Sequence, residues 1–550
     1  MIVPMKHLDL VCVASEREAT LEKLRELGAV HLDLASAASA PIAAAEGGLA
    51  DAEKAVRIVL KARDRRTDLE IRQRSVDEVL ALDADRATLV AERDRLKRLI
   101  GVYAPYGDFD PALARRLRDS VEGIDEVVPL PEKLPEMRLS RMREKLDRVE
   151  NRIRVDTEKL ASVDDRHILE SFPNLRDRIA FEQARELLAD RGAVSVITGW
   201  IPVSRVSELM DIVTSAKADL FERSRAIGWG VLLRDAEPGE TPPTLIEPPK
   251  MFRAIKVLFS GLGIAPGYTE GDVSVPFMCY FSLFFAMLVG DGGYGAIILA
   301  LTLFGWRRYR ADGAKSALFR GWLVLLTVFS SATIVWGLIS NTWFGAELPF
   351  ASEWPTVKWL GDPTYNNMMF LCFTIGVSHL VLARLWNAVC RINSADCLPE
   401  FGWAGILVFM YFVVNAIVGI SGGVPSWTFW MFGVSVLLVV SKTRGVALGM
   451  LPLNIMSAMG DIISYVRLFA VGYASLQVAK NFNAMAIDLN LPLWAKIVPM
   501  VAILLIGHGI NFALAGLSIL VHAVRLNTLE FSNHKGLTWS GYAFSPFKKH

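Results

Sequence analysis

Cysteine is scarce in this sequence and follows no metal-binding pattern. Only five cysteines occur among 550 residues, at positions 12, 279, 372, 390 and 397, without the paired spacing of a zinc site. An odd number of isolated thiols is typical of a reduced compartment rather than of a disulfide framework. The sequence therefore predicts neither a metal nor any other cofactor.

Neither sign of charge is in excess, and a nucleotide-binding loop is missing. The chain carries 59 Lys and Arg against 58 Asp and Glu, a net charge of +1, with no separate basic block, which argues against a partner nucleic acid. The pattern G-x-x-x-x-G-K-S/T does not occur. The apolar stretch Leu8–Ala14 is too short for a signal peptide, so the domain that follows is expected to stay in the cytoplasm.

Long hydrophobic runs are confined to the C-terminal half. Apolar side chains make up 52% of the sequence and the mean hydropathy is +0.34, which is high for a soluble protein. Charged residues dominate up to about Pro249, and bilayer-length apolar runs begin near Pro276. We therefore predict a cytoplasmic domain (1–249) with an extended Pro-rich end, a linker (250–275), a transmembrane domain (276–532) and a cytoplasmic tail (533–550).

The N-terminal domain is predicted to be α+β. A strand at residues 7–14, a helix at Arg17–Leu27 stopped by Gly28, and a strand at Val30–Leu34 form one βαβ unit. A second unit is expected to begin with a strand at 193–200 and a helix from about 204 to 216. The two units bracket everything between them.

Two charged helical segments lie between these units and are predicted to pair as an antiparallel coiled coil. Their apolar residues recur at three- and four-residue spacing; they are Leu89, Leu96, Leu99 and Tyr103, then Leu146, Val149, Ile153, Leu160 and Val163. Residues 107–135 are expected to form the reversal or a small tip lobe. The pair is either a solvated arm or a strut that docks partners.

The first membrane stretch, Pro276–Trp306, is interrupted by Gly290–Gly295 (Gly-Asp-Gly-Gly-Tyr-Gly). Its pattern fits one long tilted helix or two short arms. The positive-inside rule places the basic loop that follows in the cytoplasm; this loop carries Arg307, Arg308, Arg310, Lys315 and Arg320. Since an even number of crossings must then separate the loop from the N-terminal domain, a hairpin is favoured.

About eight membrane helices are predicted when the hairpin counts as two. The further spans are 321–341, 368–390, 403–420, 427–440, about 446–482 and about 493–526. The acidic segment 341–367 then lies outside, and the basic residues that follow later spans lie inside. We expect a multi-pass protein of the lipid bilayer, in a prokaryotic plasma membrane, with both termini cytoplasmic.

One arginine lies in the middle of an apolar span. Arg467 is surrounded by apolar residues within 460–475, and a guanidinium at membrane depth costs on the order of 3 to 10 kcal/mol or more unless water or a carboxylate meets it. The acid nearest in sequence, Asp461, is six residues away and is expected on a different helix face. A carboxylate on another subunit is the economical partner.

The last span carries a predicted polar stripe. Residues at spacings of three and four would line water or another polar helix; they are His508, Asn511, Ala515, Ser518, His522 and Arg525. Arg525 fits either a snorkelling anchor or a functional charge, and His522 either a packing residue or a proton relay. A fixed arginine is useful in proton or sodium translocation, because it favours the ionised form of a passing carboxylate and drives proton release.

These motifs resemble those of subunit I, the a subunit, of V-type and archaeal A-type rotary ATPases. The resemblance rests on Ser464–Leu468 (Ser-Tyr-Val-Arg-Leu), and on Gly507–His508 leading to His522–Leu526 and Glu530–Phe531. Upstream, it includes Pro242–Thr244, Gly290–Gly295 and Gly199–Pro202, so it covers nearly the whole chain in order.

The resemblance implies that Arg467 faces the carboxylates of a rotating c ring, with Arg525 as its companion. A half-channel beside them would involve His522, Ser518, Asn511, His508, Ser464 and Asp461. The N-terminal part would be a stator arm that holds the peripheral stalk subunits E and G, and the central-stalk socket subunit is a further candidate partner. The chain would be a non-catalytic, ion-translocating subunit, with ATP chemistry on partner subunits.

Two other classes stay open. One is a secondary transporter with a cytoplasmic regulatory domain, whose substrate site is the glycine-broken hairpin; the other is a membrane anchor for the coiled-coil arm. The lack of a visible inverted repeat and the two arginines in consecutive spans favour the rotary subunit, and the polar stripe counts against the anchor. The sequence does not indicate whether the ion is a proton or sodium. It also does not indicate whether the complex works in the direction of ATP synthesis or of ion pumping.

Overall fold

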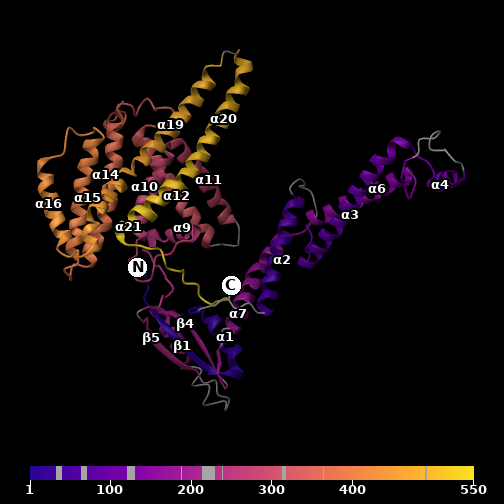
Figure 1. Ribbon diagram of the computed structural model, residues 1–550, viewed down its shortest axis with the longest axis horizontal. Coiled ribbons are helices and arrows are strands. Elements are labelled where there is room, and N and C mark those ends of the chain that lie inside the picture. The colour runs from indigo at the N-terminus through magenta and orange to yellow at the C-terminus, as the bar shows by residue number, and fades with distance from the viewer. Residues whose placement is uncertain are drawn as a thin grey trace. The chain divides into compact units, whose positions relative to one another are not determined.

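The computed structural model describes residues 1–32, 40–63, 71–120, 131–186, 189–191, 193–213, 229–237, 239–311, 317–362, 364–489 and 492–549. Its contacts divide the chain into an N-terminal unit, Lys6–Asp235 with Ser545–His550, and a membrane unit, Met1–Met5 with Ala236–Phe544 (Figure 1). Parts of three expected segments lie outside the described residues: the strand at 30–34, the helix at 204–216 and the tip at 107–135.

Within the described residues, the N-terminal unit contains a five-stranded sheet. Its order is β2-β4-β1-β5, with β3 paired to β4, and the β1–β5, β2–β4 and β3–β4 pairs are antiparallel. The two predicted βαβ units share this one sheet: β4 lies between β1 and β2, and β1 lies between β4 and β5, in a split βαβ arrangement. The strands are β1 (Met5–Val13), β2 (His31–Leu32), β3 (Ala189–Arg191), β4 (Val194–Pro202) and β5 (Gly230–Asp235).

Glycine at two positions shapes this unit. Helix α1 (Arg17–Leu27) has the predicted bounds and ends at Gly28, which is left-handed with φ of 56°. On β4, a side chain at Gly199 would meet the carbonyl oxygen of His31 at 2.4 Å. Only glycine therefore lets β2 approach β4, which gives the Gly-Trp-Ile-Pro motif a structural role.

The predicted coiled coil is present and is part of a longer helical arm. Its two helices are α3 (Val76–Tyr103) and α6 (Leu139–Ala161), and the arm also contains α2 (Ala40–Arg63) and α7 (Asp165–Glu186). The residues just before α3 and just after α6 are bonded, since Arg72 N donates to Ser162 O at 2.7 Å. At the other end, Tyr103 and Met137 line one small cavity. The two helices are therefore antiparallel, as predicted.

Two acids before α4 (Pro111–Ser120) fix the first turn of α6. Asp108 accepts a hydrogen bond from Ser140 N at 3.1 Å, and Asp110 pairs with Arg138. The backbone bond from Ser140 lowers the pKa of Asp108, and the hydrogen bond from Arg138 lowers the pKa of Asp110. Both carboxylates are therefore stabilised in their ionised form.

The membrane unit is mostly helical. Helix α9 lies in the stretch 250–275 that was expected to be a linker, and its Ile255 and Leu258 are buried in the core of this unit. The helices are α9 (Ile255–Leu262), α10 (Ser274–Val289), α11 (Gly292–Ala311), α12 (Ala317–Ser340), α13 (Pro355–Leu360), α14 (Asn366–Cys390), α15 (Cys397–Ile417), α16 (Ser426–Val440), α17 (Val446–Gly449), α18 (Leu451–Ile463), α19 (Val466–Ile487), α20 (Leu493–Ser518) and α21 (Ser532–Lys535).

Five helices in the described part of the chain are long and apolar enough to cross a membrane, so this is a multi-pass membrane protein. They cover 317–340, 366–390, 397–417, 451–487 and 494–535. The prediction of about eight is wrong as a count. Helices α10 and α16 have 16 and 15 residues, which rise about 24 and 22 Å, less than the roughly 30 Å of a hydrocarbon core.

The glycine-rich break separates α10 from α11 by a bend of 119°, which gives the two arms that the sequence favoured. Asp291 in the break is 3% exposed. Its carboxylate accepts hydrogen bonds from the backbone N–H groups of Gly293 (2.7 Å), Phe344 (2.8 Å) and Gly345 (2.9 Å). Asp291 therefore ties the break to the loop that follows α12.

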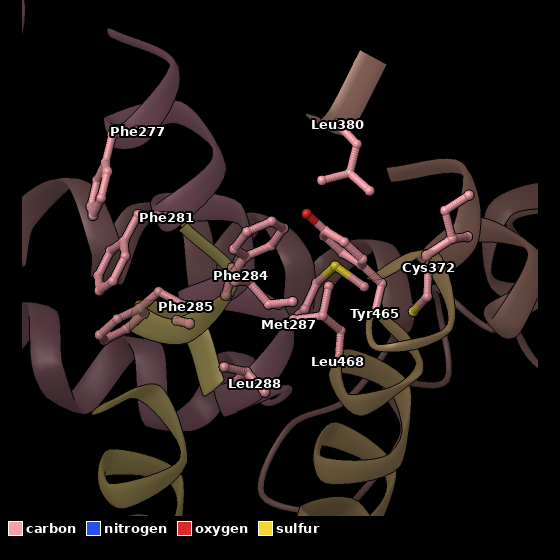
Figure 2. Packing of buried hydrophobic residues seen from close by; sticks show 14 of the residues in the cluster. Phe277, Phe281, Phe284, Phe285, Met287, Leu288, Cys372, Leu380, Tyr465 and Leu468 are labelled. Carbon is pink, nitrogen blue, oxygen red and sulfur yellow. The ribbon is translucent and has the colours of Figure 1, made fainter. Parts of the chain in front are cut away.

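An aromatic core packs α10 against its neighbours. Figure 2 shows Phe277, Phe281, Phe284 and Phe285 following one another along α10, with the ring of Tyr465 beside Phe284. The centroids of Phe284 and Tyr465 are 5.9 Å apart, at the edge-to-face angle of 66° that aromatic rings favour. This contact joins α10 to the junction between α18 and α19.

The segment expected as a C-terminal tail is ordered by contacts within each unit. In the membrane unit, Glu270 accepts hydrogen bonds from the N–H and hydroxyl of Thr538, at 2.8 and 2.6 Å. In the N-terminal unit, Phe547 is buried in the core and its N–H bonds to Val30 O at 2.8 Å. The tail therefore contributes to both units.

Candidate functional site

Arg467 lies directly after the break between α18 and α19. At this break the N–H groups of Tyr465 and Leu468 bond three residues back, to Ile462 O and Tyr465 O, at 3.1 and 3.0 Å. The helix is therefore locally tighter than an α-helix. The Ser464 carbonyl accepts a hydrogen bond from Arg467 Nε at 2.9 Å, which holds the guanidinium close to the break.

Tyr465 anchors this break in the core. Its side chain is fully buried, and its hydroxyl lies 2.8 Å from His379 Nδ1 on α14. A side chain at Gly376 would meet the Tyr465 ring at 2.6 Å, so α14 packs closely against the break. Dense packing of this kind leaves little freedom to the residue two positions further on, Arg467.

The last long helix widens into π-helical turns on both sides of Arg525. The turns are Ile519–Ala523 and Leu526–Phe531, and such turns are frequent at functional sites. In an α-helix, the side chains of residues five apart point about 140° away from each other. A π-turn is wider, with hydrogen bonds between residues five apart, so the fifth residue returns close to the side of the first. Glu530 is therefore brought back to the side of Arg525.

Glu530 lies between the two arginines. Its Oε1 is 2.7 Å from Arg467 Nη2 and 3.4 Å from Arg525 Nε, and the Ser464 hydroxyl donates to the same oxygen at 3.1 Å. The Glu530 side chain is 5% exposed, that of Arg467 22% and that of Arg525 55%. We call these four residues the arginine cluster. Two guanidinium groups and one carboxylate give it a formal charge of +1.

This pairing corrects the expectation that Arg467 finds its carboxylate only on another subunit. Glu530 is 63 residues away in the sequence, so no local spacing connects the two. The second oxygen, Oε2, is buried and has no hydrogen-bond partner among the described residues. One acceptor of the arginine cluster is therefore left for a further donor.

Asp461 belongs to a second polar cluster. Its Oδ2 lies 3.0 Å from His534 Nε2, and Arg384 Nε donates to His534 Nδ1 at 3.2 Å. Arg384 also pairs with Glu400 at 3.2 Å. The Ser464 hydroxyl is 2.8 Å from the Asp461 carbonyl oxygen, so it links this cluster to the arginine cluster.

The polar stripe predicted on the last span divides into two parts. His508 and Asn511 both bond to the hydroxyl of Tyr294, at 2.8 and 3.0 Å. Ser518 instead donates to a carbonyl of its own helix, and His522 Nδ1 is buried without a partner among the described residues. The structure thus brings His508 and Asn511 together, but not with Ser518 and His522.

Sequence reasoning missed several contributors to these contacts, among them Tyr294, Glu530 and His534. Tyr294 and Glu530 lie in quoted motifs, Gly-Asp-Gly-Gly-Tyr-Gly and Glu-Phe, but nothing in the sequence showed what they touch. His534 lay beyond the predicted end of the span, which continues to residue 535. Among the described residues, no group of His, Cys, Asp and Glu is arranged to hold a metal.

The glycine-rich break is closely packed at Gly292 and Gly293. Side chains from the loop after α12 fill it: the nearest atoms that a methyl at Gly292 would meet belong to Trp343, at 3.1 Å, and at Gly293 to Phe344, at 2.6 Å. Close packing, together with the buried bonds of Asp291, explains the motif structurally. The transporter alternative gains no support here.

Fold and site define a multi-pass membrane protein with an intramembrane cluster of two arginines and one glutamate, carrying an α+β unit with a coiled-coil arm. No protein-family model matches the chain. The chain belongs to the subunit I family of V-type and A-type ATP synthases, as three relatives show.

The relatives come from bacteria and an archaeon. The chain is 32% identical to V-type ATP synthase subunit I of Borreliella burgdorferi over 399 residues, which are 68% of this chain and 63% of the relative. It is 28% identical to V-type ATP synthase subunit I 1 of Treponema pallidum over the whole of both chains. It is 26% identical to A-type ATP synthase subunit I of Methanocaldococcus jannaschii over 64% of this chain and 54% of that protein.

Proposed function

We propose that this chain is the membrane stator subunit of a rotary V/A-type ATPase, in which Arg467 and Arg525 face the carboxylates of a rotating c ring. The observation that carries the proposal is the convergence of two arginines from different helices on Glu530, with more than half of the Arg525 side chain exposed. Intramembrane charges of this kind mark ion pathways. The relatives' names supply the complex.

The charge of the arginine cluster suits this task. At +1 it favours the ionised form of any carboxylate that faces it in a low-dielectric site. A ring carboxylate that arrives protonated would therefore release its proton beside the cluster. The same fixed charge would oppose a direct leak of cations between two half-channels. Sodium would be treated in the same way, so the cluster does not select between the two ions.

Helix α20 would provide the surface that meets the ring. Within the span 494–535, only 11% of the most apolar 18-residue stretch is buried against the rest of the chain. Its exposed apolar side chains contact lipid or another apolar helix in a bilayer; they include Leu505, Ile506, Leu517 and Leu520. Arg525 follows on the same span, so we assign its neighbourhood to the ring and the remaining exposed surface to lipid.

The N-terminal unit would act as the stator arm that holds the peripheral stalk subunits E and G. Its helices α3 and α6 are linked by ion pairs between Lys97 and Glu150 (2.7 Å) and between Lys145 and Glu92 (2.5 Å), which fits a solvated strut. We place this unit and both termini in a prokaryotic cytoplasm, with the central-stalk socket subunit as a further candidate partner. ATP chemistry would belong to other subunits.

Replacement of Arg467 in reconstituted complexes tests the proposal. Arg467→Ala should abolish ATP-driven ion pumping while the chain still copurifies with the ring, and Arg467→Lys, which lacks the planar fork, should retain only part of the rate. Arg444→Ala removes an exposed arginine from the loop after α16 and should pump normally. Full pumping by Arg467→Ala would overturn the assignment.

A further inference from the structure

An open hollow of about 650 Å³ lies on the surface of α11. Its volume is within the range of roughly 300–1,000 Å³ that ligand pockets have. The described residues that line it all belong to α11, and none of them belongs to the arginine cluster. They are Ala300, Leu303, Phe304, Trp306, Arg307 and Arg310. Most of them recur at spacings of three and four, so the hollow follows one face of the helix.

The hollow changes from apolar to basic along its length. Leu303 and Phe304 are 54% and 68% exposed, which suits contact with acyl chains. Arg307 and Arg310 follow on the same face; both are exposed, and neither makes an ion pair with another described residue. The ten residues from Ala300 to Arg310 rise about 15 Å, half of the roughly 30 Å of a hydrocarbon core. The lining thus matches the upper part of a lipid, from its chains to its phosphate.

Aromatic rings beside the two arginines indicate the level of the lipid headgroups. The indole N–H of Trp306 donates to the Thr327 hydroxyl at 3.3 Å, which holds this ring against α12. The rings of Trp306 and Tyr309 are 5.9 Å apart, and those of Tyr309 and Phe319 are 6.1 Å apart. Tryptophan and tyrosine are enriched where a membrane meets water. The basic end of the hollow is therefore expected among the headgroups.

Positive charge dominates this end of the membrane unit. Residues 300–330 contain five basic residues and one acidic residue, a net charge of +4. Helix α9 packs against the start of α12, because a side chain at Gly321 would meet Val257 at 2.3 Å, and it brings the exposed Lys256 to the same end. Basic pockets on the cytoplasmic side of membrane helices bind anionic headgroups. Charge complementarity therefore favours an anionic lipid over a zwitterionic one.

We propose that this hollow binds one anionic phospholipid of the cytoplasmic leaflet. The lipid phosphate accepts charge-assisted hydrogen bonds from Arg307 and Arg310, and the acyl chains lie on Leu303 and Phe304. A free phosphate ion would leave these two apolar side chains uncovered, so the occupant is a lipid. The site contributes nothing to the ion path and does not rest on the proposed function.

Photo-crosslinking of the assembled complex tests the site. The complex is reconstituted into vesicles of equal parts of phosphatidylcholine and phosphatidylglycerol, with a trace of either lipid carrying a photoreactive acyl chain. Adducts on residues 300–310 are measured by mass spectrometry. The phosphatidylglycerol probe should label this segment at least about tenfold more than the phosphatidylcholine probe, because each arginine favours an anionic lipid about fivefold.

Paired variants show whether the two arginines select the lipid. Arg307→Gln combined with Arg310→Gln should lower the phosphatidylglycerol adducts at least about tenfold. Lys442→Gln combined with Arg444→Gln removes the same charge from the exposed loop after α16 and should leave the adducts unchanged. Arg307→Lys combined with Arg310→Lys keeps the charge without the planar fork and should retain most of the preference for phosphatidylglycerol.

Equal labelling by the two probes would mean that only bulk lipid covers α11, and this comparison needs no variant. Undiminished adducts in the double glutamine variant would also overturn the site. So would displacement of the probe by inorganic phosphate but not by chloride of the same ionic strength, or crosslinks from residues 300–310 to another subunit in place of lipid. None of these measurements uses pumping, so the site and the proposed function can fail independently.

Discussion

Removing the carboxylate of Glu530 should destabilise the membrane unit. Glu530 is 5% exposed and holds Arg467 at 2.7 Å. Deleting one partner of a buried ion pair costs about 3–5 kcal/mol, because the other charge stays buried without compensation. The contact with Arg525, whose side chain is 55% exposed, adds less than about 1 kcal/mol. We expect Glu530→Ala to lower the free energy of unfolding by about 3–5 kcal/mol.

The isosteric variant separates charge from hydrogen bonding. Glu530→Gln keeps one acceptor for Arg467. It should therefore lower the free energy of unfolding by about half as much as Glu530→Ala does. It also raises the formal charge of the arginine cluster from +1 to +2, so a ring carboxylate would be held more firmly and pumping should slow. Stability is measured by denaturant titration of the chain in detergent micelles, and pumping in reconstituted complexes.

Glu347→Ala is the matched control for the unfolding measurement. It also removes a glutamate from an ion pair, with Lys480 at 3.2 Å, but the Glu347 side chain is 66% exposed. We therefore expect a loss below about 1 kcal/mol. Unfolding of Glu530→Ala at the same denaturant concentration as this control would refute the reasoning.

Three further changes have defined outcomes. Asp291→Ala leaves three N–H groups, two of them buried, without their acceptor and should cost at least about 3 kcal/mol in the same titration. Asp362→Ala removes a half-buried carboxylate whose hydrogen bonds are exposed and should cost far less. Gly199→Val places a side chain against the His31 carbonyl and should displace β2, seen as faster hydrogen exchange of its amides. The lowered pKa of Asp110 means that its pairing with Arg138 stabilises the tip above about pH 4 and is lost as pH falls through the folded pKa. Asp110→Asn should reduce that pH dependence in circular dichroism and leave the part that comes from Asp108, whose pKa is also lowered.

Elements with a local signal were predictable from the sequence. Helix α1 with its stop at Gly28, the antiparallel helices α3 and α6, and the two arms around the glycine-rich break all follow from spacing and from turn residues. The position of β4 between β1 and β2 does not, because a strand pattern shows which face is buried and not which strand is the neighbour. The count of membrane helices failed where short apolar helices resemble full spans.

The arginine cluster could be predicted only in part. Arg467 and Arg525 stood out as charges in apolar runs, but Glu530 did not, for two reasons. It is 63 residues from Arg467 in the sequence, and its offset of five from Arg525 places it on another face of any regular α-helix. The π-turns around Arg525 remove that second obstacle, and they have no signature in a pattern of period 3.6.

In the proposed function, the shared carboxylate would allow two arginines to serve a moving partner. Each additional unit charge at about 4 Å, at an effective dielectric constant of about 20, attracts a passing carboxylate by about 4 kcal/mol. A cluster of +2 would therefore bind the ring carboxylate firmly and delay rotation, whereas +1 still favours proton release. Glu530 is closest to Arg467, the less exposed arginine, so the charge left over is carried mainly by Arg525, whose side chain is 55% exposed. Under the proposed function, Arg525 would thus be the group best placed to meet each ring carboxylate and to let it pass.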